Sequence, residues 1–463
     1  MPNQRRGDPQ FQSDREQGSL VQFDTSLNRT LRNSIVTDGR LRRLWTDPEQ
    51  RRWLAFGALA ATYALVSVYR LSTAVLADEL TRAFSVTGTQ LGTLHASFFY
   101  VYAAMQLPAG VFADRLGSRR TVAVGTVVMS LGGFGFAFAD SYAAAFVGRA
   151  LVGFGGSVLF IAILRFCANW FRPSEFARMS GLTLAVAGFG GVLATTPLAL
   201  AVATAGWRET LVGLSVVGLA LAATAYLLAR DSPSDAGFDP MAGAETPGAP
   251  SLRAILSNAR HVLAEAETWL CGMVLFAGTG INITVFGLWG IPYLVQTYGV
   301  SVTFASTFTL LGSAGLLLGP PTIGAVSDRL GSRTGLVVVG MGLYTASFAV
   351  LSVTGRPPMA VVAVVFFAAG ALAGGYALTY AVVKERHDAA ASGVSTGTVN
   401  TMAFTGAAVL PTLMGLALDT YWTGDTIGGA RVYSEFGYRV AFGLAAAVSL
   451  VAFLAALELH RRS

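Results

Sequence analysis

The chain carries the stretch Gly110-Val-Phe-Ala-Asp114-Arg-Leu-Gly-Ser-Arg119, and a near copy, Gly324-Ala-Val-Ser-Asp328-Arg-Leu-Gly-Ser-Arg333, lies in its second half. The residues Asp-Arg-Leu-Gly-Ser-Arg are identical in both copies. Each copy follows the second apolar window of its half, which indicates a duplicated structural unit. The glycine permits close helix approach, the aspartate can accept hydrogen bonds from a neighbouring helix N-terminus, and the arginines anchor a membrane face. The alternative is a basic turn that only fixes topology.

Apolar windows long enough to cross a bilayer follow one another on both sides of the repeat. Hydrophobic residues make up 53% of the sequence, charged residues 13%, and the mean hydropathy is +0.56, so a bilayer is the expected solvent. Windows are expected at residues 53–77, 89–112, 120–139, 142–166, 178–203, 208–229, 268–294, 303–326, 335–354, 359–383, 391–418 and 438–459. This pattern predicts an all-α membrane protein with twelve transmembrane helices in two pseudo-symmetric six-helix bundles.

Composition divides the chain into four predicted segments. Residues 1–51 are polar and Arg-rich without the apolar core of a signal peptide, and we expect a disordered cytoplasmic N-terminal tail. Residues 52–230 and 268–463 are the expected N-terminal and C-terminal six-helix bundles. Residues 231–267 are more polar and rich in Pro, Gly and Ser at their start, which predicts a cytoplasmic central linker.

The positive residues predict the orientation, because they are retained on the cytoplasmic side. The connections after the even-numbered windows hold Arg115, Arg119, Arg120, Arg172, Arg178, Arg230, Arg253, Arg260, Arg329, Arg333, Lys384 and Arg386. The opposite connections hold Asp78, Glu79, Asp140, Asp419, Asp425 and Glu435, with only Arg82, Arg208, Arg356, Arg431 and Arg439 among them. We therefore expect a multi-pass inner-membrane protein with both termini cytoplasmic. The same topology accounts for the net charge of +6 and the pI near 9.5 without a nucleic-acid partner.

The repeated stretch resembles the signature loop of the major facilitator superfamily, G-x-x-x-D-R-x-G-R-R/K. The matching residues are Gly110, Asp114, Arg115, Gly117, Arg119 and Arg120, with Asp328, Arg329, Gly331 and Arg333 in the second copy, and the resemblance covers residues 52–463. It implies the family's twelve-helix fold around one central cavity and alternating access by rocking of the bundles. It also implies that Asp114 helps to close the cytoplasmic side by a contact near Ser392.

A narrower resemblance points to the anion:cation symporters, the organophosphate antiporters and the vesicular glutamate and sialate carriers. Tyr69-Arg70-Leu-Ser-Thr-Ala-Val-Leu is similar to their first helix, and His95 and Gln106 have the spacing of the second helix of the glutamate carriers. Arg149-Ala-Leu-Val-Gly resembles the fourth-helix R-x-x-x-G segment. In that branch the two arginines serve the anionic substrate or its gating network. Gly156 stands where proton-coupled members have a glutamate.

Physical reasoning on the arginines leaves two readings of each. An arginine inside a span costs at least ~2.5 kcal/mol on insertion scales, so it must face protein, water or substrate. Arg70 lies deep in its window, and substrate binding competes with structural pairing. For Arg149, ligand contact competes with hydrogen bonding to neighbouring carbonyls. Arg165, near the cytoplasmic end of its window, is interpreted as a topology anchor.

Other polar residues in the windows complete the candidate site. His95 is the proton-coupling candidate, because its pKa lies near neutrality, and helix packing is the competing reading. Gln106 is expected to shape and pack the second helix. Substrate binding, interhelical bonding or packing is open for Tyr69, Tyr100, Asn282, Trp289 and Asn400, and Tyr376 and Tyr380 are further aromatic candidates for the cavity.

These features predict a secondary active transporter of a small solute, an organic anion, that works by rocker-switch alternating access. The coupling ion stays open between a proton, sodium, exchange and uniport, so symport is one of several modes. No cofactor, metal or enzyme chemistry is expected, because His/Cys clusters, a Walker loop and paired catalytic carboxylates are missing from the sequence. The expected partners are the small-molecule substrate and the lipid bilayer, and the protein is expected to be a monomer. The alternatives are an exporter of lipophilic compounds and a transport-silent membrane sensor.

Overall fold

Long apolar helices make up almost all of the described residues in the computed structural model, which are residues 47–239, 260–386, 389–427 and 429–463. The first set is α3 (Pro48–Leu71), α4 (Thr73–Phe84), α5 (Gly88–Ala104), α6 (Gln106–Ala137), α7 (Tyr142–Ser157), α8 (Leu159–Trp170), α9 (Pro173–Leu193), α10 (Thr196–Ala205) and α11 (Trp207–Leu228), followed by the short turn η1 (Ser234–Ala236). Most of the expected tail, and residues 240–259 of the expected linker, lie outside the described residues.

The second set of elements begins after that gap. It comprises α13 (Ala266–Thr284), η2 (Val285–Trp289), α14 (Gly290–Tyr298), α15 (Val302–Leu330), α16 (Arg333–Thr354), α17 (Met359–Ala371), α18 (Ala373–Arg386), α19 (Ala389–Thr420), β1 (Trp422–Ile427), β2 (Ala430–Tyr433) and α20 (Glu435–Arg461). Tertiary contacts place residues 56–463 in one unit, while residues up to 55 belong to another. All packing described below lies within residues 56–463.

The expected twelve crossings are confirmed. Eleven stretches of the described chain are long and apolar enough to span a bilayer. One of them, which ends at Ala137, contains the kink at Gly117, so the second and third crossings are joined in it. The second crossing begins with α5 and continues through Met105 to this kink, and the third runs from there to Ala137. Because α10 continues the crossing that α9 begins, the total is twelve.

Six crossings of the described chain are interrupted. The second is broken at Met105 between α5 and α6, the fifth at Ala194 and Thr195 between α9 and α10, and the other four are the first, fourth, seventh and tenth. The breaks of these four fall at Ser72 between α3 and α4, at Val158 between α7 and α8, at the π-helical turn η2, and at Leu372 between α17 and α18. Each of these last four crossings opens a group of three, as a nested three-helix repeat requires. Side chains near two breaks satisfy freed carbonyls, since Ser72 Oγ donates to Tyr69 O at 2.9 Å and Ser157 Oγ donates to Phe154 O at 2.7 Å.

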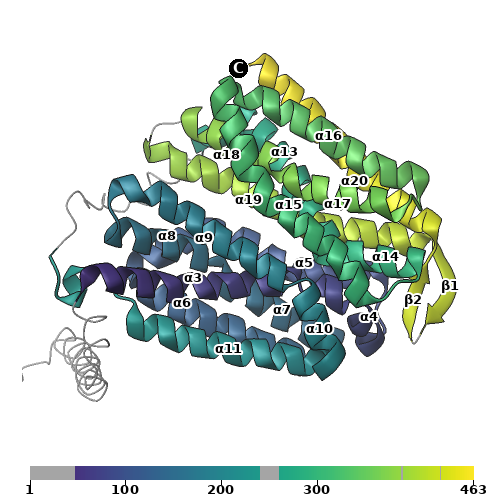
Figure 1. Cartoon of the computed structure of the whole chain (residues 1–463), viewed down its shortest axis with the longest axis horizontal. Helices are drawn as coiled ribbons and strands as arrows, with labels where there is room; N and C mark the ends of the chain where they lie inside the picture. The colour runs from purple at the N-terminus through teal and green to yellow at the C-terminus, as the bar shows by residue number, and fades with distance from the viewer. Residues whose placement is uncertain (1–46, 240–259, 387–388, 428) are drawn as a thin grey trace, which may run out of the picture. The chain divides into compact units, whose positions relative to one another are not determined.

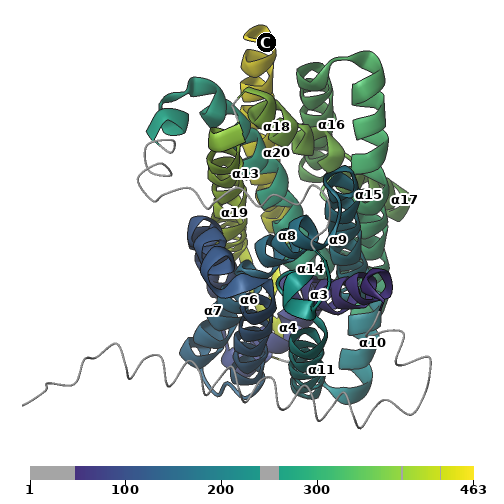
Figure 2. The same cartoon turned by 90° about the vertical axis from the view of Figure 1, so that its left-hand side faces the viewer.

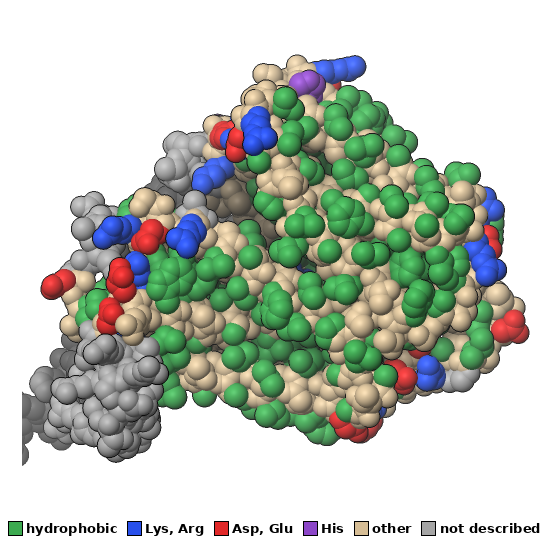
Figure 3. Space-filling model, in the orientation of Figure 1, with side chains coloured by type: hydrophobic (Ala, Val, Ile, Leu, Met, Phe, Trp, Pro, Cys, Tyr) green, Lys and Arg blue, Asp and Glu red, His purple; other side chains and the backbone are tan. Residues whose placement is uncertain are grey.

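The helices form two bundles that Figure 1 shows as a purple-to-teal group and a green-to-yellow group. The N-terminal bundle runs from Phe56 to the end of α11, and the C-terminal bundle from α13 to α20. Figure 2 shows the same separation from a second side. Hydrophobic side chains cover the face seen in Figure 3, and charged ones gather towards its ends, as expected for a surface in contact with lipid.

The two ends of the bundles differ. The end that carries Asp114–Arg120 and Asp328–Arg333 is called the DRLGSR end, and Figure 3 shows a hollow between the bundles on that side. The other, called the hairpin end, carries the antiparallel pair β1–β2, with Trp422 opposite Tyr433. There, α5 packs on α19, α10 packs on α15, and α4 contacts η2, α14 and β2.

Glycines allow the helices of the N-terminal bundle to approach closely. A Cβ at Gly153 would overlap the backbone of Phe98 in α5, and one at Gly155 would overlap the backbone of Gly125 and Met129 in α6. The glycine-rich segment around Gly153 is therefore a packing feature, because only residues without a side chain leave room for backbone contact.

We expect Gly153→Ala to lower the melting temperature of the purified protein, because overpacking a tight contact costs about 1–3 kcal/mol. The matched control is Gly213→Ala in α11, where nothing lies within 4 Å of the added methyl group. This control should keep or raise the melting temperature, since alanine favours a helix by about 0.5–1 kcal/mol. Equal behaviour of the two variants would contradict the packing described here.

Candidate functional site

Arg70 lies in the first crossing, two residues before the break at Ser72. Its side chain is half-buried, and its Nη2 donates to Ser67 Oγ at 3.0 Å. Within the described ranges, no Asp or Glu forms an ion pair with Arg70. The guanidinium lies within electrostatic range of the Tyr102 hydroxyl. A cation with no protein counter-charge therefore adjoins the interior of the molecule.

Tyr102 joins the surroundings of Arg70 to both bundles. Its buried side chain interacts with the side chains of Tyr63 and Gln106 in the N-terminal bundle. On its other side, the Tyr102 ring lies 4.5 Å from the ring of Phe404 in α19, centroid to centroid. Aromatic walls of this kind bury the apolar part of a ligand while their hydroxyls remain available for hydrogen bonds.

A chain of hydrogen bonds crosses from one bundle to the other beside these tyrosines. Asn400 Nδ2 donates to Gln106 Oε1 at 2.7 Å, and Tyr380 OH donates to Asn400 Oδ1 at 2.6 Å. Tyr380 is in turn within electrostatic range of Tyr63, so the contacts close into a ring. The ring and Arg70 are called the central polar cluster, which comprises Tyr63, Arg70, Tyr102, Gln106, Tyr380 and Asn400.

Sequence reasoning identified part of this cluster. Arg70 and Asn400 were predicted site residues, and Tyr380 was a candidate for the cavity wall. Gln106 was expected only to pack the second helix, and Tyr63 and Tyr102 were not singled out. Their signal in the sequence is weak, because tyrosines are equally common at membrane interfaces. Only the approach of the first, second, tenth and eleventh crossings brings these side chains together.

Arg149 and His95 form a second buried polar pair. Arg149 is 2% exposed, its Nε and Nη2 have no hydrogen-bond partner among the described residues, and its guanidinium lies 5.5 Å from the Phe136 ring centroid. His95 is fully buried within electrostatic range of Arg149, and neither ring nitrogen has a partner in the described part of the chain. Its ring points towards Gly287 in the π-helical turn η2. Unpartnered polar groups in an apolar interior are costly, so burial of this pair lowers the stability of the fold.

The remaining predicted binding residues lie apart from the central polar cluster. Tyr69 OH bonds to Ser215 Oγ at 2.8 Å, and Tyr100 is 41% exposed on α5. Asn282 Nδ2 donates to Ala369 O at 3.4 Å. Trp289 Nε1 donates to Pro411 O at 3.0 Å. Three of these four side chains bond to their own bundle, and their role in substrate binding stays a prediction.

At the DRLGSR end, Asp114 forms an ion pair with Arg165 of α8. The predicted contact of Asp114 near Ser392 involves a side chain outside those described. Gly110 does not provide the expected close approach, since a Cβ there would meet nothing within 4 Å. Gly117 is required for a different reason, because its φ of 77° lies in a region that other residues rarely adopt. Arg115 and Arg120 are exposed.

Asp231 stabilises the start of the third crossing. Its Oδ1 accepts a hydrogen bond from the Arg119 backbone N–H at 2.8 Å, and its carboxylate fills the space beside Gly117. The backbone carbonyl of Asp231 accepts from Asn169 Nδ2 at 2.9 Å, which ties the segment after α11 to α8. Arg119 Nε donates to Tyr226 O at 2.7 Å. All of these contacts lie within the N-terminal bundle and the residues that follow it.

The second copy of the loop makes an equivalent contact with reversed charge. Arg333 Nη2 pairs with Glu385 Oε1 of α18 at 2.6 Å. Gly331 ends α15 with φ 62°, and Asp328 and Arg329 are exposed. In both bundles, therefore, the loop after the second helix is joined by an ion pair to the fourth helix.

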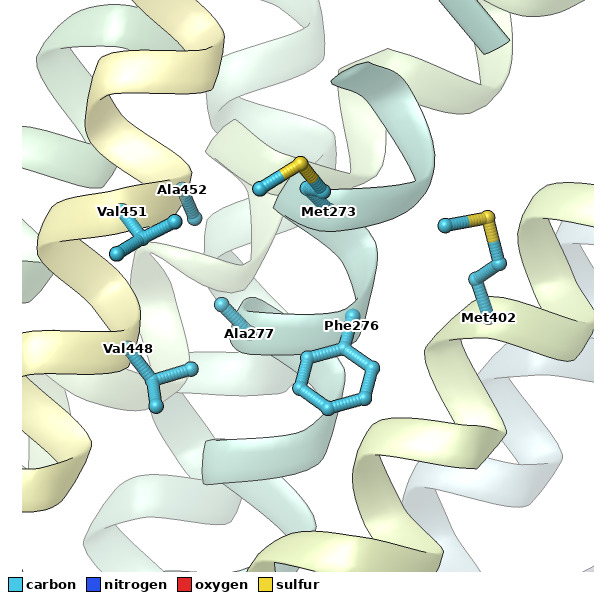
Figure 4. A pocket seen from close by; sticks show the side chains of 7 residues that line it. All are labelled: Met273, Phe276, Ala277, Met402, Val448, Val451 and Ala452. Carbon is cyan, nitrogen blue, oxygen red and sulfur yellow. The ribbon is translucent and has the colours of Figure 1, made fainter. Parts of the chain in front are cut away.

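One apolar pocket lies apart from these polar groups (Figure 4). It has a volume of about 350 Å³ between α13, α19 and α20, and its lining includes Met273, Phe276, Met402 and Val451. The pocket presents almost no polar surface, so it offers nothing to bind a charged solute. Among the described residues, no group of three or more His, Cys, Asp and Glu side chains is arranged to hold a metal ion.

Comparisons with known proteins agree with this architecture. The family model of the Major Facilitator Superfamily matches residues 53–411 and 268–463. The chain is 26% identical to a probable sulfoacetate transporter of Cupriavidus necator over 63% of its length and 68% of that protein, and 27% identical to the hexuronate transporter of Bacillus subtilis over 58% and 61%. These matches thus span about two thirds or less of each relative.

Two further similarities cover more of the chain. A membrane sensor protein of Salmonella typhimurium, UhpC, is 25% identical over 78% of this chain and 84% of its own length. The crystal structure of a bacterial homologue of the human lysosomal transporter Spinster, in an inward-facing and occupied conformation, superposes with a TM-score of 0.70, 17% identity, and coverage of 88% of this chain and 96% of that chain. The last similarity concerns the fold alone.

We expect Asp231→Ala to lower the melting temperature, because removing a carboxylate that caps a helix N-terminus costs about 0.5–2 kcal/mol. Asp231→Asn should lie between this variant and the parent, since it keeps an acceptor without the charge. The control is Asp239→Ala, an exposed carboxylate in the same segment. Identical melting curves for Asp231→Ala and Asp239→Ala would contradict a capping role.

Proposed function

Since the chain belongs to the Major Facilitator Superfamily, a family of multi-pass membrane transporters, we propose that it is a secondary active transporter that moves a small organic anion. The site is the central polar cluster, with Arg70 as the group that selects negative charge. The cargo reaches this cluster alternately from the two sides of the membrane as the bundles rock against each other.

Arg70 carries this proposal. A guanidinium in a membrane span costs at least ~2.5 kcal/mol, and an ion pair with a protein carboxylate is the usual compensation. Arg70 has no such partner among the described residues, and Ser67 supplies only a neutral acceptor. An anionic solute would provide the missing charge through hydrogen bonds that are stronger than neutral ones. The relatives named for sulfoacetate and hexuronate, both anions at neutral pH, support the same chemical class.

The other members of the cluster suit the uncharged part of such a solute. Gln106 and Asn400 offer amide donors and acceptors from opposite bundles, and the hydroxyls of Tyr102 and Tyr380 lie beside them. A ligand that contacts both bundles can shift the equilibrium between their two arrangements, which alternating access requires. Arg149 is a second candidate cation for the anion, because two of its nitrogens lack partners among the described residues. His95 beside it is the candidate carrier of a coupled proton.

The contacts between the bundles support a rocking mechanism. At the hairpin end the bundles join through α5 with α19 and α10 with α15, whereas Asp114 and Arg333 at the DRLGSR end pair within their own bundles. The DRLGSR end is rich in arginine, so we assign it to the cytoplasm. This assignment makes the described conformation inward-facing and places the chain ends on the cytoplasmic side.

A membrane sensor is the second candidate function. The similarity to UhpC covers a larger share of this chain than the similarity to either transporter. A sensor would use the same central polar cluster to bind its signal without moving it. The distinguishing observation is a folded protein that binds an anion yet shows no flux.

We expect Arg70→Ala to reduce uptake of sulfoacetate or a hexuronate into proteoliposomes by ~10- to 100-fold, because hydrogen bonds to charged groups contribute about 1.5–3 kcal/mol. Arg70→Lys should retain part of the uptake, since the charge remains but the planar geometry is lost. The control is Arg82→Ala, whose side chain pairs with Glu79 at the surface of the hairpin end.

The same assay separates the alternatives. Equal anion uptake by the parent and Arg70→Ala would refute the role of Arg70. Flux of a lipophilic cation that survives the substitution would instead support an exporter. Anion binding without uptake, in protein that elutes as a single folded species, would support the sensor.

A further inference from the structure

Asp419, at the end of α19, is a charged side chain that joins the two bundles at the hairpin end. Asp419 Oδ1 accepts from the Gly88 backbone N–H at 2.7 Å. Its Oδ2 accepts from the Thr89 N–H at 2.8 Å and from Thr89 Oγ1 at 2.7 Å. We propose that Asp419 is the latch of the hairpin end, a carboxylate from the C-terminal bundle that caps α5 of the N-terminal bundle and holds that end shut. The proposal rests on the alternating access described above.

The position of the carboxylate explains why this contact is strong. Gly88 is the first residue of α5, so its N–H and that of Thr89 have no acceptor within the helix. A helix N-terminus carries partial positive charge, and a carboxylate there makes charge-assisted hydrogen bonds. Asp419 is also shielded, since only 16% of its side chain is exposed.

Close backbone contact makes the latch specific to the closed arrangement. A Cβ at Gly88 would meet the Gly415 carbonyl at 2.9 Å, and one at Gly92 would meet the Cα of Thr412 at 2.8 Å. The hydroxyls of Thr93 and Thr412 lie 3.3 Å apart. Helices α5 and α19 therefore touch along their backbones for more than a turn. Any separation of the bundles at this end breaks all three bonds to Asp419 together.

The hairpin holds the carboxylate in place from its own bundle. Arg431 Nη1 lies 3.4 Å and Tyr433 OH 3.5 Å from Asp419 Oδ1. The backbone of β2 is fixed in turn by Gln296 of α14, whose Oε1 accepts from Tyr433 N at 2.9 Å and whose Nε2 donates to Arg431 O at 3.1 Å. When the end opens, Arg431 remains beside Asp419 as a counter-charge, so the carboxylate is not left unpaired.

The other hydrogen bonds across this end are neutral. Among the described residues there, they include the Thr93–Thr412 pair, the bond from Ser306 Oγ to Thr196 Oγ1 at 3.1 Å, and a contact of the Tyr433 hydroxyl with the backbone of Gly88. Neutral hydroxyl pairs exchange readily for water, whereas a carboxylate at a helix N-terminus is bound more firmly. Asp419 is therefore the contact whose loss should most change the balance between closed and open states.

The test uses purified protein in detergent, so that both ends are accessible and no cargo is needed. Cys167 and Cys271 are first replaced by serine, and Thr93→Cys with Thr412→Cys places two thiols on the facing helices. We expect these thiols to form a disulfide readily under mild oxidation. Adding Asp419→Asn should slow disulfide formation and speed the reaction of a Thr93→Cys single variant with a bulky maleimide, each by roughly tenfold. Asp425→Asn, an exposed hairpin carboxylate, is the matched control and should change neither rate.

Unchanged rates in Asp419→Asn would overturn the latch. If that variant does not fold, Thr89→Ala removes one of the three bonds and should shift both rates in the same direction by a smaller factor, while unchanged rates in this variant would also overturn it. The thiol reactions do not require transport. A protein that shows the expected rate changes but no uptake of any solute would refute the proposed transport and leave the latch, and uptake with unchanged rates would do the reverse.

Discussion

A positive charge inside an apolar span is the constraint on which the rest of this molecule depends. Arg70 cannot face lipid without a large penalty, so protein must enclose it, and it has no carboxylate partner among the described residues. The two bundles provide the enclosure, with Tyr63 and Tyr102 on one side and Tyr380, Asn400 and Phe404 on the other. A half-buried guanidinium without a carboxylate partner is suited to bind an anion reversibly. Four of the six interrupted crossings, the first, fourth, seventh and tenth, each open a three-helix group.

Two carboxylates cap helix N-termini, one within a bundle and one between the bundles. Asp231 caps the start of the third crossing from within its own bundle, and that contact can persist while the bundles move. Asp419 caps α5 from the opposite bundle, and that contact must break when the hairpin end opens. A carboxylate cap thus stabilises the N-terminal bundle at Asp231. In the proposed mechanism, the cap by Asp419 forms and breaks as the bundles move. The two DRLGSR loops add ion pairs of reversed polarity, Asp114 with Arg165 and Arg333 with Glu385.

The fold could be predicted from the sequence to a large extent, because crossing a bilayer is a requirement on consecutive residues. Hydropathy located the spans, and the repeated loop indicated the duplication. The breaks at Ser72, Val158 and Leu372 could not be predicted, since none has a proline, while α15 and α19 continue through Pro320, Pro321 and Pro411. Packing against neighbouring helices decides where a span bends.

A single residue that is costly inside a bilayer can be recognised in the sequence, whereas a residue whose role depends on a distant partner cannot. Arg70 is conspicuous in an apolar window. Nothing in the local sequence distinguishes Gln106 from other polar residues, and only the fold brings it to Asn400, 294 positions away. In the sequence, Asp419 is one of several acidic residues in the expected outer connections. Only the fold places it beside the first residues of α5. No local pattern encodes such contacts, because they depend on how the two bundles meet.

Equilibrium binding measures whether Arg70 attracts a negatively charged solute. The dissociation constants of the purified protein for glucuronate and for glucose compare two rings that differ in a carboxylate. If Arg70 selects negative charge, the protein binds glucuronate measurably and glucose much more weakly, and Arg70→Ala loses this preference. Equal affinity for the two sugars, or a preference for glucuronate that persists without Arg70, would contradict this role of Arg70.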